Sequence, residues 1–286
     1  MSDSAVGVAL VAAAAVAWST AGYFTRLIPV ALFAMLVWRN VFGGSFMTAY
    51  VFATQRRRAF RSFAELGVVG WLAALVNGLS MICYLAALRH TSVANVAVIY
   101  ATAPFGAAAI AWLAYRDRAS TRTLLAGLLA LTGVAITVGG TSPGRGLTGD
   151  FLALGMMIGL ATFTVVMRHH RRASMLPAAA ASGWIGALIA LPFATHLDVG
   201  AHQLVNLALF GVTSFGLGLI LYTIGARYLH PARTALISTL DTPLAPLWVW
   251  LAFSERPALA TIIGGVIILA AVAADIVGVR EPVPAV

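Results

Sequence analysis

The chain lacks most features of a water-soluble protein. Only 9% of its 286 residues are charged, and none of its basic residues is lysine. An ordinary soluble domain is about 25% charged, so this chain has too few charges to cover a globular surface in water. It also has a single cysteine, Cys83, which lies within an apolar run and excludes an intrachain disulfide. A large soluble domain is therefore excluded.

Long apolar runs take the place of the missing charges. Hydrophobic residues make up 61% of the sequence, and a helix needs ~20 mostly apolar residues to cross a bilayer. Short connections containing Pro29, Pro177, Pro231 and Pro257 separate the runs. The pattern predicts an all-α integral membrane protein with ten transmembrane helices. We expect these helices at residues 5–25, 30–54, 66–88, 92–114, 121–140, 150–167, 177–196, 203–225, 232–252 and 258–278.

The arginines indicate the orientation of the chain in the membrane. With the N-terminus in the cytoplasm, 13 arginines fall on the cytoplasmic side, 4 fall on the opposite side, and Arg39 lies within a span. Arginine accumulates in cytoplasmic loops, so we expect both termini to lie in the cytoplasm. We expect the protein to be a multi-pass protein of the plasma membrane, which is the inner membrane of a bacterium. The 13 include Arg233, placed in the connection before the ninth helix. This clustering between apolar runs is a topology signal and argues against nucleic acid as a partner.

An internal repeat divides the chain into two halves. A shift of 138 residues places Tyr84 on Tyr222, Arg89 on Arg227, Trp112 on Trp250, Asp117-Arg118 on Glu255-Arg256, and Gly127 on Gly265. Each half then has five helices, at residues 1–143 and 144–286. Because five is odd, the two halves cross the membrane in opposite senses. The sequence therefore predicts two inverted five-helix repeats, which are typical of secondary transporters.

Several motifs carry a resemblance to a known family. They are Ala17-Trp18-Ser19-Thr20, Arg39, the helices from Pro104 to Asp117-Arg118 and from Pro243 to Glu255-Arg256, and the glycines Gly127 and Gly264-Gly265. With these motifs the chain resembles the EamA-type ten-helix permeases of the drug/metabolite transporter superfamily, and among them the YddG-type amino-acid exporters. The resemblance implies export of amino acids, other metabolites or toxic compounds. Four-helix relatives keep a glutamate in the first helix for proton coupling; this chain lacks it, so that mechanism does not carry over.

Polar and aromatic residues inside the spans are the candidates for a substrate cavity. Thr234, Ser238, Asp241 and Thr242 share one face of the ninth helix, and Asn77, Ser80 and Tyr84 share one face of the third. Asn95 and Thr102 lie seven residues apart in the fourth helix. Polar groups are costly in lipid, so these faces should point to a shared interior. The predicted cavity residues are Trp18, Asn77, Ser80, Tyr84, Tyr100, Thr102, Trp184, Tyr222, Ser238 and Asp241. For each aromatic residue, helix packing is an equally good interpretation.

Two further features concern charge and helix geometry. Arg39 and Asp241 are opposite charges near mid-membrane, and we expect both to face the interior of the bundle. Either residue could bind a charged substrate group, and Asp241 could relay a proton. The alternative is that the two form a structural ion pair or a gate. Asp275 is placed at the cytoplasmic interface.

Pro104, Pro243 and Pro246 should kink helices four and nine, and paired interruptions point to a transporter's binding site. Simple packing kinks are the alternative.

The leading functional hypothesis is a monomeric secondary transporter that works by alternating access on a small-molecule substrate, with the lipid bilayer as its other partner. Its substrates would be amino acids, aromatic or hydrophobic ones included, with cationic drugs or other metabolites as the alternative. A channel would need a ring of charge or filter loops, and an enzyme would need clustered catalytic groups. The sequence shows neither, so no enzymatic activity, cofactor or metal is expected; His169-His170 lacks metal-ligand spacing.

Overall fold

The computed structural model describes residues 3–91, 93–138, 147–170, 175–254 and 256–278, and all regular secondary structure in these ranges is helical. Some predictions fall outside the described residues. These concern the boundary between residues 143 and 144, Arg145, Arg171, Arg172, Glu255 and Arg280, and the side chains of Arg89 and Asn95.

The first half of the chain supplies five membrane-spanning segments. They are α1 (Asp3–Ser19) with α2 (Ala21–Leu27), α3 (Leu32–Gln55), α5 (Gly67–His90), α6 (Val93–Tyr100) with α7 (Ala103–Tyr115), and α8 (Thr121–Val138). Between α3 and α5 the chain forms a short surface turn of helix, η1 (Arg56–Arg58) and α4 (Ala59–Ala64), which the sequence patterns do not predict.

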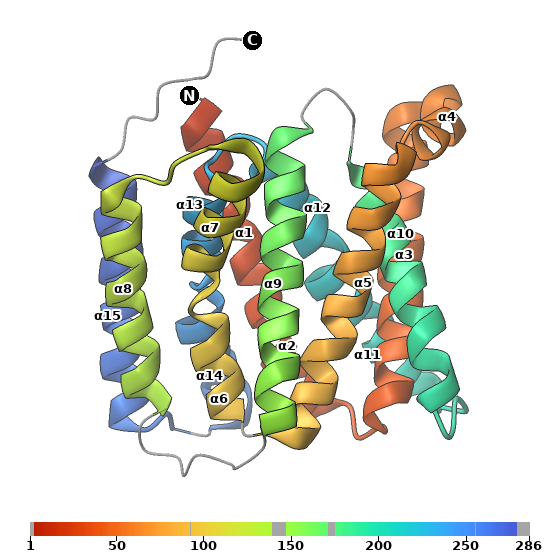
Figure 1. Cartoon of the computed structure of the whole chain (residues 1–286). Helices are drawn as coiled ribbons and strands as arrows, with labels where there is room; N and C mark the ends of the chain where they lie inside the picture. Colours follow the sequence, from red (N-terminus) through yellow and green to blue (C-terminus); the bar gives the residue numbers. More distant parts are fainter. Residues whose placement is uncertain (1–2, 92, 139–146, 171–174, 255, 279–286) are drawn as a thin grey trace.

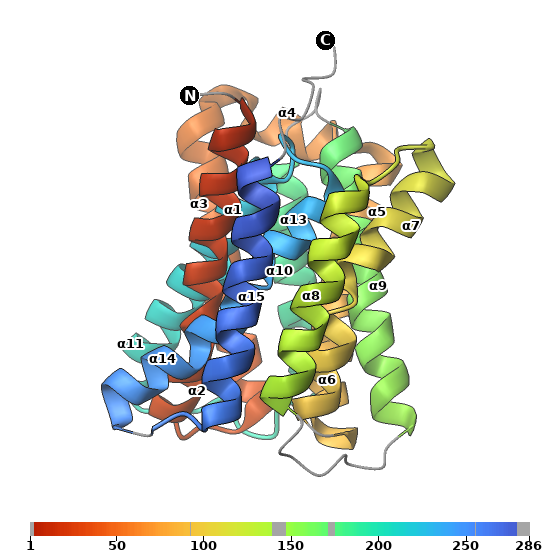
Figure 2. The same ribbon diagram turned by 90° about the vertical axis from the view of Figure 1, so that its left-hand side faces the viewer.

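The second half supplies the other five segments. They are α9 (Leu147–His169), α10 (Leu176–Ala190) with η2 (Leu191–Phe193), α11 (Ala201–Phe210) with the π-helical η3 (Gly211–Leu217) and α12 (Gly218–Gly225), α13 (Pro231–Ser238) with α14 (Asp241–Phe253), and α15 (Leu259–Gly278). Figure 1 shows these segments running side by side along one direction, and Figure 2 shows α8 and α15 as neighbours.

The described segments agree with the ten predicted spans. Eight of them are long and apolar enough to cross a membrane, and α8 is a shorter apolar helix. The tenth, α3, is 24 residues long and carries the buried residues Arg39 and Asn40, which lower its hydropathy. The predicted ten-helix membrane fold is therefore confirmed.

The repeat is visible in the helix boundaries. A shift of 138 residues moves α6 and α7 onto the bounds of α13 and α14, and moves the start of α8 onto that of α15. The residues that end α7 and α14, Arg116 and Ser254, are also 138 apart, and both have a left-handed φ of 57°. The two halves thus share local geometry as well as residue types.

Proline explains why two spans are broken in the middle. Pro104 and Pro243 have no backbone N–H, and each ring clashes with the carbonyl four residues earlier. Those carbonyls belong to Tyr100, the last residue of α6, and Thr239, the first residue after α13. The predicted interruptions are therefore full breaks. At Pro246, in contrast, α14 continues.

The first span is broken as well, although it contains no proline. Ser19 and Thr20 donate their hydroxyl protons to the carbonyls of Val16 and Ala17, at 2.7 and 2.6 Å. Such bonds to the preceding turn compete with the helical ladder and bend helices. In addition, the Trp248 indole donates to the Ser19 hydroxyl at 2.7 Å, which ties α14 to the end of α1.

Candidate functional site

The two broken spans meet at the centre of the bundle. The hydroxyls of Tyr100, at the end of α6, and Ser238, at the end of α13, lie 3.5 Å apart. Thr102 lies in the break between α6 and α7, where its hydroxyl donates to the carbonyl of Ile99 at 2.6 Å. Half-helix ends near mid-membrane are where transporters place substrate groups.

Asp241 lies at the same level, in the first turn of α14. Its carboxylate accepts a hydrogen bond from the Thr242 hydroxyl at 3.2 Å and is partly exposed. The positive end of the α14 dipole stabilises a negative charge in this position. Among the described residues, no arginine or histidine lies within ion-pair distance of Asp241.

Tyr84 lies near Asp241 and keeps part of its surface exposed. It lies within electrostatic range of Arg39, Asp241 and Tyr100, which come from three other helices. A side chain among these groups is inside the bundle, yet 37% of Tyr84 is exposed. The structure thus places Tyr84, Tyr100 and Asp241 within electrostatic range of one another.

Trp18 of α1, in the first half, packs against Tyr222 of α12, in the second half. Their ring centroids are 4.8 Å apart, and the Tyr222 hydroxyl lies 2.6 Å from that of Thr164. Gly218 makes this contact feasible, since a Cβ there would lie 2.6 Å from the Trp18 ring. Tyr222 is fully buried. It therefore supports Trp18 and has no exposed surface for a ligand in this conformation.

Three of the predicted cavity residues serve other contacts. Asn77 donates to Ser182 of α10 at 2.9 Å, and Ser80 donates to the carbonyl of Met156 in α9 at 2.7 Å. Both are buried and join α5 to its neighbours. Trp184 is 44% exposed, and it lies on the same stripe of α10 as the exposed Leu188, a face that suits lipid. The structure does not bring these three to Asp241.

Arg39 has its own pocket, built by close helix contact. Its guanidinium lies 5.3 and 5.1 Å from the ring centres of Phe210 and Phe215, and it donates to the sulfur of Met81 at 3.6 Å. Gly211 allows this approach of η3 to α3, because a Cβ there would lie 2.5 Å from the Arg39 carbonyl. Among the described residues no ion pair joins Arg39 to Asp241, so the two charges face the interior separately.

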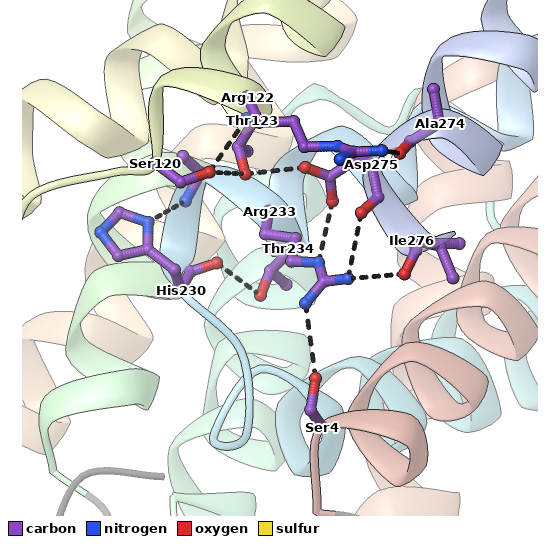
Figure 3. A network of polar contacts seen from close by, with 11 residues as sticks. Ser4, Ser120, Arg122, Thr123, His230, Arg233, Thr234, Ala274, Asp275 and Ile276 are labelled. Atoms are coloured by element: carbon purple, nitrogen blue, oxygen red, sulfur yellow. Dashed lines mark hydrogen bonds and ion pairs between the residues drawn. The ribbon is translucent and has the colours of Figure 1, made fainter. Parts of the chain in front are cut away.

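The ion pair that the structure does contain inside the bundle was not predicted. Arg233 lies in α13, not in a loop, and its Nε donates to the Asp275 carboxylate at 2.8 Å (Figure 3). Asp275, which lies three residues before the end of α15, has no exposed surface because neighbouring helices cover it. Thr123 of α8 donates to the other carboxylate oxygen at 2.8 Å. The pair therefore joins α8, α13 and α15.

A second cluster lies where α7 and α9 end and α13 begins. The Asp117 carboxylate lies 3.4 Å from His169 and 3.6 Å from His230. The His230 Nδ1 accepts from the backbone N–H of Ala232, so its Nε2 carries the proton that faces Asp117. The His169 ring stacks on Tyr115, with centroids 3.9 Å apart. One carboxylate thus joins three helix ends.

The two ends of the bundle are not equivalent. We call the end where α1 begins and α15 finishes the terminal end (Figure 1). There α7 packs against α13, next to the two charged clusters. At the opposite end α6 and α14, which the repeat relates to α13 and α7, do not pack against each other in this way. The structure is therefore closed at the terminal end and more open at the other.

Two surface recesses lie away from these residues. One, of about 480 Å³, lies between the α2–α3 connection at residues 29–31 and residues 196–203, which form the connection before α11 and its first turn. The other, of about 620 Å³, lies on α5 beside Trp71 and Leu72. Neither recess includes a predicted site residue.

The fold and the central crossing define the class: a membrane protein of two inverted helical halves with paired broken helices, the architecture of secondary transporters. Residues 5–139 and 147–274 each match the EamA-like transporter family. The chain belongs to this family, and the predicted resemblance to the drug/metabolite transporter superfamily is confirmed. A solved structure titled "Crystal structure of protein" shares the fold, with a TM-score of 0.79 and 17% identity over 95% of this chain and 96% of that one. Among curated proteins, none matches.

Proposed function

We propose that the protein is a secondary transporter that exports small metabolites, amino acids foremost, across the bacterial inner membrane by alternating access. Its termini are placed in the cytoplasm, and it works as a monomer. The YddG-type resemblance favours aromatic or hydrophobic amino acids. Tyr84 is partly exposed and lies within electrostatic range of Asp241, and Trp18 packs on Tyr222; these side chains supply polar and aromatic surface for such a substrate.

The observation that carries this proposal is the difference between the two ends of the bundle. Inverted repeats have two conformations in which the halves exchange roles. Here α7 and α13 pack together at the terminal end, while their repeat equivalents do not at the other. This corresponds to a state closed to the cytoplasm and open to the outside. Packing α6 against α14 while α7 and α13 separate would give the opposite state.

A channel is the alternative from another class, and the closed end argues against it. A conducting pore must be open at both ends at once. The buried Arg233–Asp275 pair and the packed α7 and α13 close one end. In a facilitative pore, the Arg233–Asp275 pair and the α7–α13 contact would both have to separate while the opposite end stayed open.

Counterflow in proteoliposomes tests the proposal. Vesicles containing the full-length protein are loaded with a high concentration of an unlabelled amino acid and diluted into a trace of the same compound with a radiolabel. A transporter that alternates between two states concentrates the label transiently, whereas a channel only equilibrates it. The panel should include phenylalanine, tryptophan, leucine, threonine and glutamate.

Transient accumulation of phenylalanine or leucine above the equilibrium level is the expected result. Equilibration without overshoot would replace the transporter with a pore. Absence of flux for every amino acid would reject the substrate assignment and direct the next panel to cationic drugs. Asp198→Asn, at an exposed carboxylate in the connection before α11, is a matched control for variants of Asp241 and should leave the accumulation unchanged.

A further inference from the structure

Asp241 and Asp275 are both carboxylates inside the bundle, but their surroundings differ. Asp275 has no exposed surface and is neutralised by Arg233 at 2.8 Å. Asp241 is partly exposed, and within the described residues no cation pairs with it. A charge in a low-dielectric interior is costly unless a partner compensates it. Asp241 is therefore a carboxyl group to which no described residue supplies a counter-charge.

The groups near Asp241 suit a cation better than an anion. The Thr242 hydroxyl donates a hydrogen bond to the carboxylate, and the positive end of the α14 dipole points toward it. Tyr84 and Tyr100 lie within electrostatic range of it. Tyrosine rings attract ammonium groups through their faces. A carboxylate with two tyrosines within electrostatic range is an arrangement that suits a protonated amine.

Arg39, the other charged candidate, does not complete an amino-acid clamp at this place. Its guanidinium is nine-tenths buried between Phe210 and Phe215 and forms no ion pair with Asp241. An α-amino acid carries its carboxylate one carbon from its amine. Arg39 lies within electrostatic range of Tyr84, but it is buried against the Phe210 and Phe215 rings and has little free surface for that carboxylate in this conformation.

We infer that Asp241 is the ammonium subsite of the transporter, and that the site recognises the positive amino group of its substrates while the carboxylate is dispensable. The substrate class is then small amphiphilic amines, of which apolar amino acids are one group. This inference rests on the proposed transport function for its physiological meaning, but binding at Asp241 can be measured without transport.

Two probes separate the charges. Phenyltrimethylammonium carries a permanent positive charge and no carboxylate, and 3-phenylpropionate carries a carboxylate and no amine. Isothermal titration calorimetry on the full-length protein in detergent measures the affinity of each for wild type, Asp241→Asn, Asp241→Glu and the control Asp198→Asn. We expect phenyltrimethylammonium, and not 3-phenylpropionate, to bind wild type. Loss of the charge in Asp241→Asn should weaken its binding at least about tenfold, while Asp241→Glu and Asp198→Asn should retain it.

A second pair of variants keeps the test valid if Asp241→Asn does not fold. Tyr84→Leu removes the ring and should weaken phenyltrimethylammonium binding several-fold, whereas Tyr84→Phe keeps the ring and should not. Equal affinity in wild type and Asp241→Asn, or tighter binding of 3-phenylpropionate, would overturn the ammonium subsite. If phenylalanine counterflow persists in that case, the transport function stands without it. If the cation binds through Asp241 but nothing shows counterflow, the transport function fails and the subsite stands.

Discussion

Tyr100 and Ser238 occupy equivalent positions in the two halves, 138 residues apart, and their hydroxyls lie 3.5 Å from each other. Ser238 donates its own proton to the carbonyl of Ala235 at 2.7 Å. Tyr100 must therefore be the donor in the contact between them. The last residues of α6 and α13 are thus equivalent by the repeat and contact each other. This contact links the break in the fourth span to the break in the ninth.

The Tyr100–Ser238 hydrogen bond is predicted to be weak, and the effects of removing its two hydroxyls on stability are predicted to be non-additive. A distance of 3.5 Å is long for a hydrogen bond between hydroxyls, so Tyr100→Phe should lower the unfolding free energy by no more than about 1 kcal/mol. Ser238→Ala should lower the unfolding free energy by less in the Tyr100→Phe background than in the wild-type background. Thermal unfolding of the two single variants and the double variant in detergent checks this. Fully additive losses would mean that the hydroxyls do not interact.

The position of the breaks could be read from the sequence because it depends on local chemistry. Pro104 and Pro243 act on the carbonyl four residues earlier wherever the helix lies. The repeat was readable for a similar reason, since residues such as Trp112 and Trp250 match in one register. The break at Thr20 was not predicted, because hydroxyls in a helix break it in some contexts and not in others.

The site was harder to predict because one helical face can serve two neighbours. Asn77, Ser80 and Tyr84 share a face of α5, yet the first two bond to α10 and α9, and Tyr84 lies within electrostatic range of Asp241. Sequence periodicity identifies polar faces and does not say which polar group finds a partner. The pair of Arg233 and Asp275 was missed because sequence periodicity does not show which helices pack together, and the pair joins α13 to α15.

Transport should depend on a pH gradient through Asp241. A carboxylate that binds an ammonium group in one state and a proton in the other exchanges the two. We expect amino-acid uptake into proteoliposomes to be faster with an imposed pH gradient for wild type, and to lose that dependence in Asp241→Asn. Asp198→Asn should behave as wild type. Gradient-independent uptake by wild type would show facilitated diffusion and leave Asp241 as a binding group alone.

The buried Arg233–Asp275 pair should be costly to break on one side. Asp275→Asn leaves the Arg233 guanidinium buried without its counter-charge, so the unfolding free energy should fall by about 3–5 kcal/mol. The double variant Arg233→Met with Asp275→Leu removes both charges and should recover most of that loss. Thermal unfolding in detergent compares them. A single variant as stable as wild type would show that water or lipid headgroups reach Arg233.

Close packing of α8 on α15 should make one glycine far more sensitive than another. A Cβ on Gly264 would collide with the Gly133 carbonyl and the Thr137 hydroxyl, whereas one on Gly155 of α9 meets only the sulfur of Cys83 at 3.6 Å. Gly264→Ala should therefore lower the unfolding free energy by about 1–3 kcal/mol. Gly155→Ala should leave the unfolding free energy unchanged or raise it by about 0.5–1 kcal/mol through helix propensity. Similar unfolding temperatures for the two variants would contradict the α8–α15 geometry.

The charged clusters at the terminal end should bias the conformational equilibrium. Arg233–Asp275 joins α13 to α15, and Asp117 faces His230 next to the start of α13, so both hold the closed end together. The charge-free double variant Arg233→Met with Asp275→Leu keeps the volume but removes the directional bonds. Its population open at the terminal end should rise, because a two-state equilibrium shifts with any difference in contact energy between the states.

Spin labels across that end measure this shift. Arg118→Cys and Tyr228→Cys place labels at exposed sites after α7 and before α13, in a Cys83→Ser background that removes the single native thiol. Pulsed electron paramagnetic resonance should give one short distance with the native pair, and a second, longer component in the charge-free variant. Asp198→Asn at the opposite end is the matched control and should leave the distribution unchanged. If the charge-free variant also keeps the single short distance, packing of α7 against α13 closes this end without help from the ion pair.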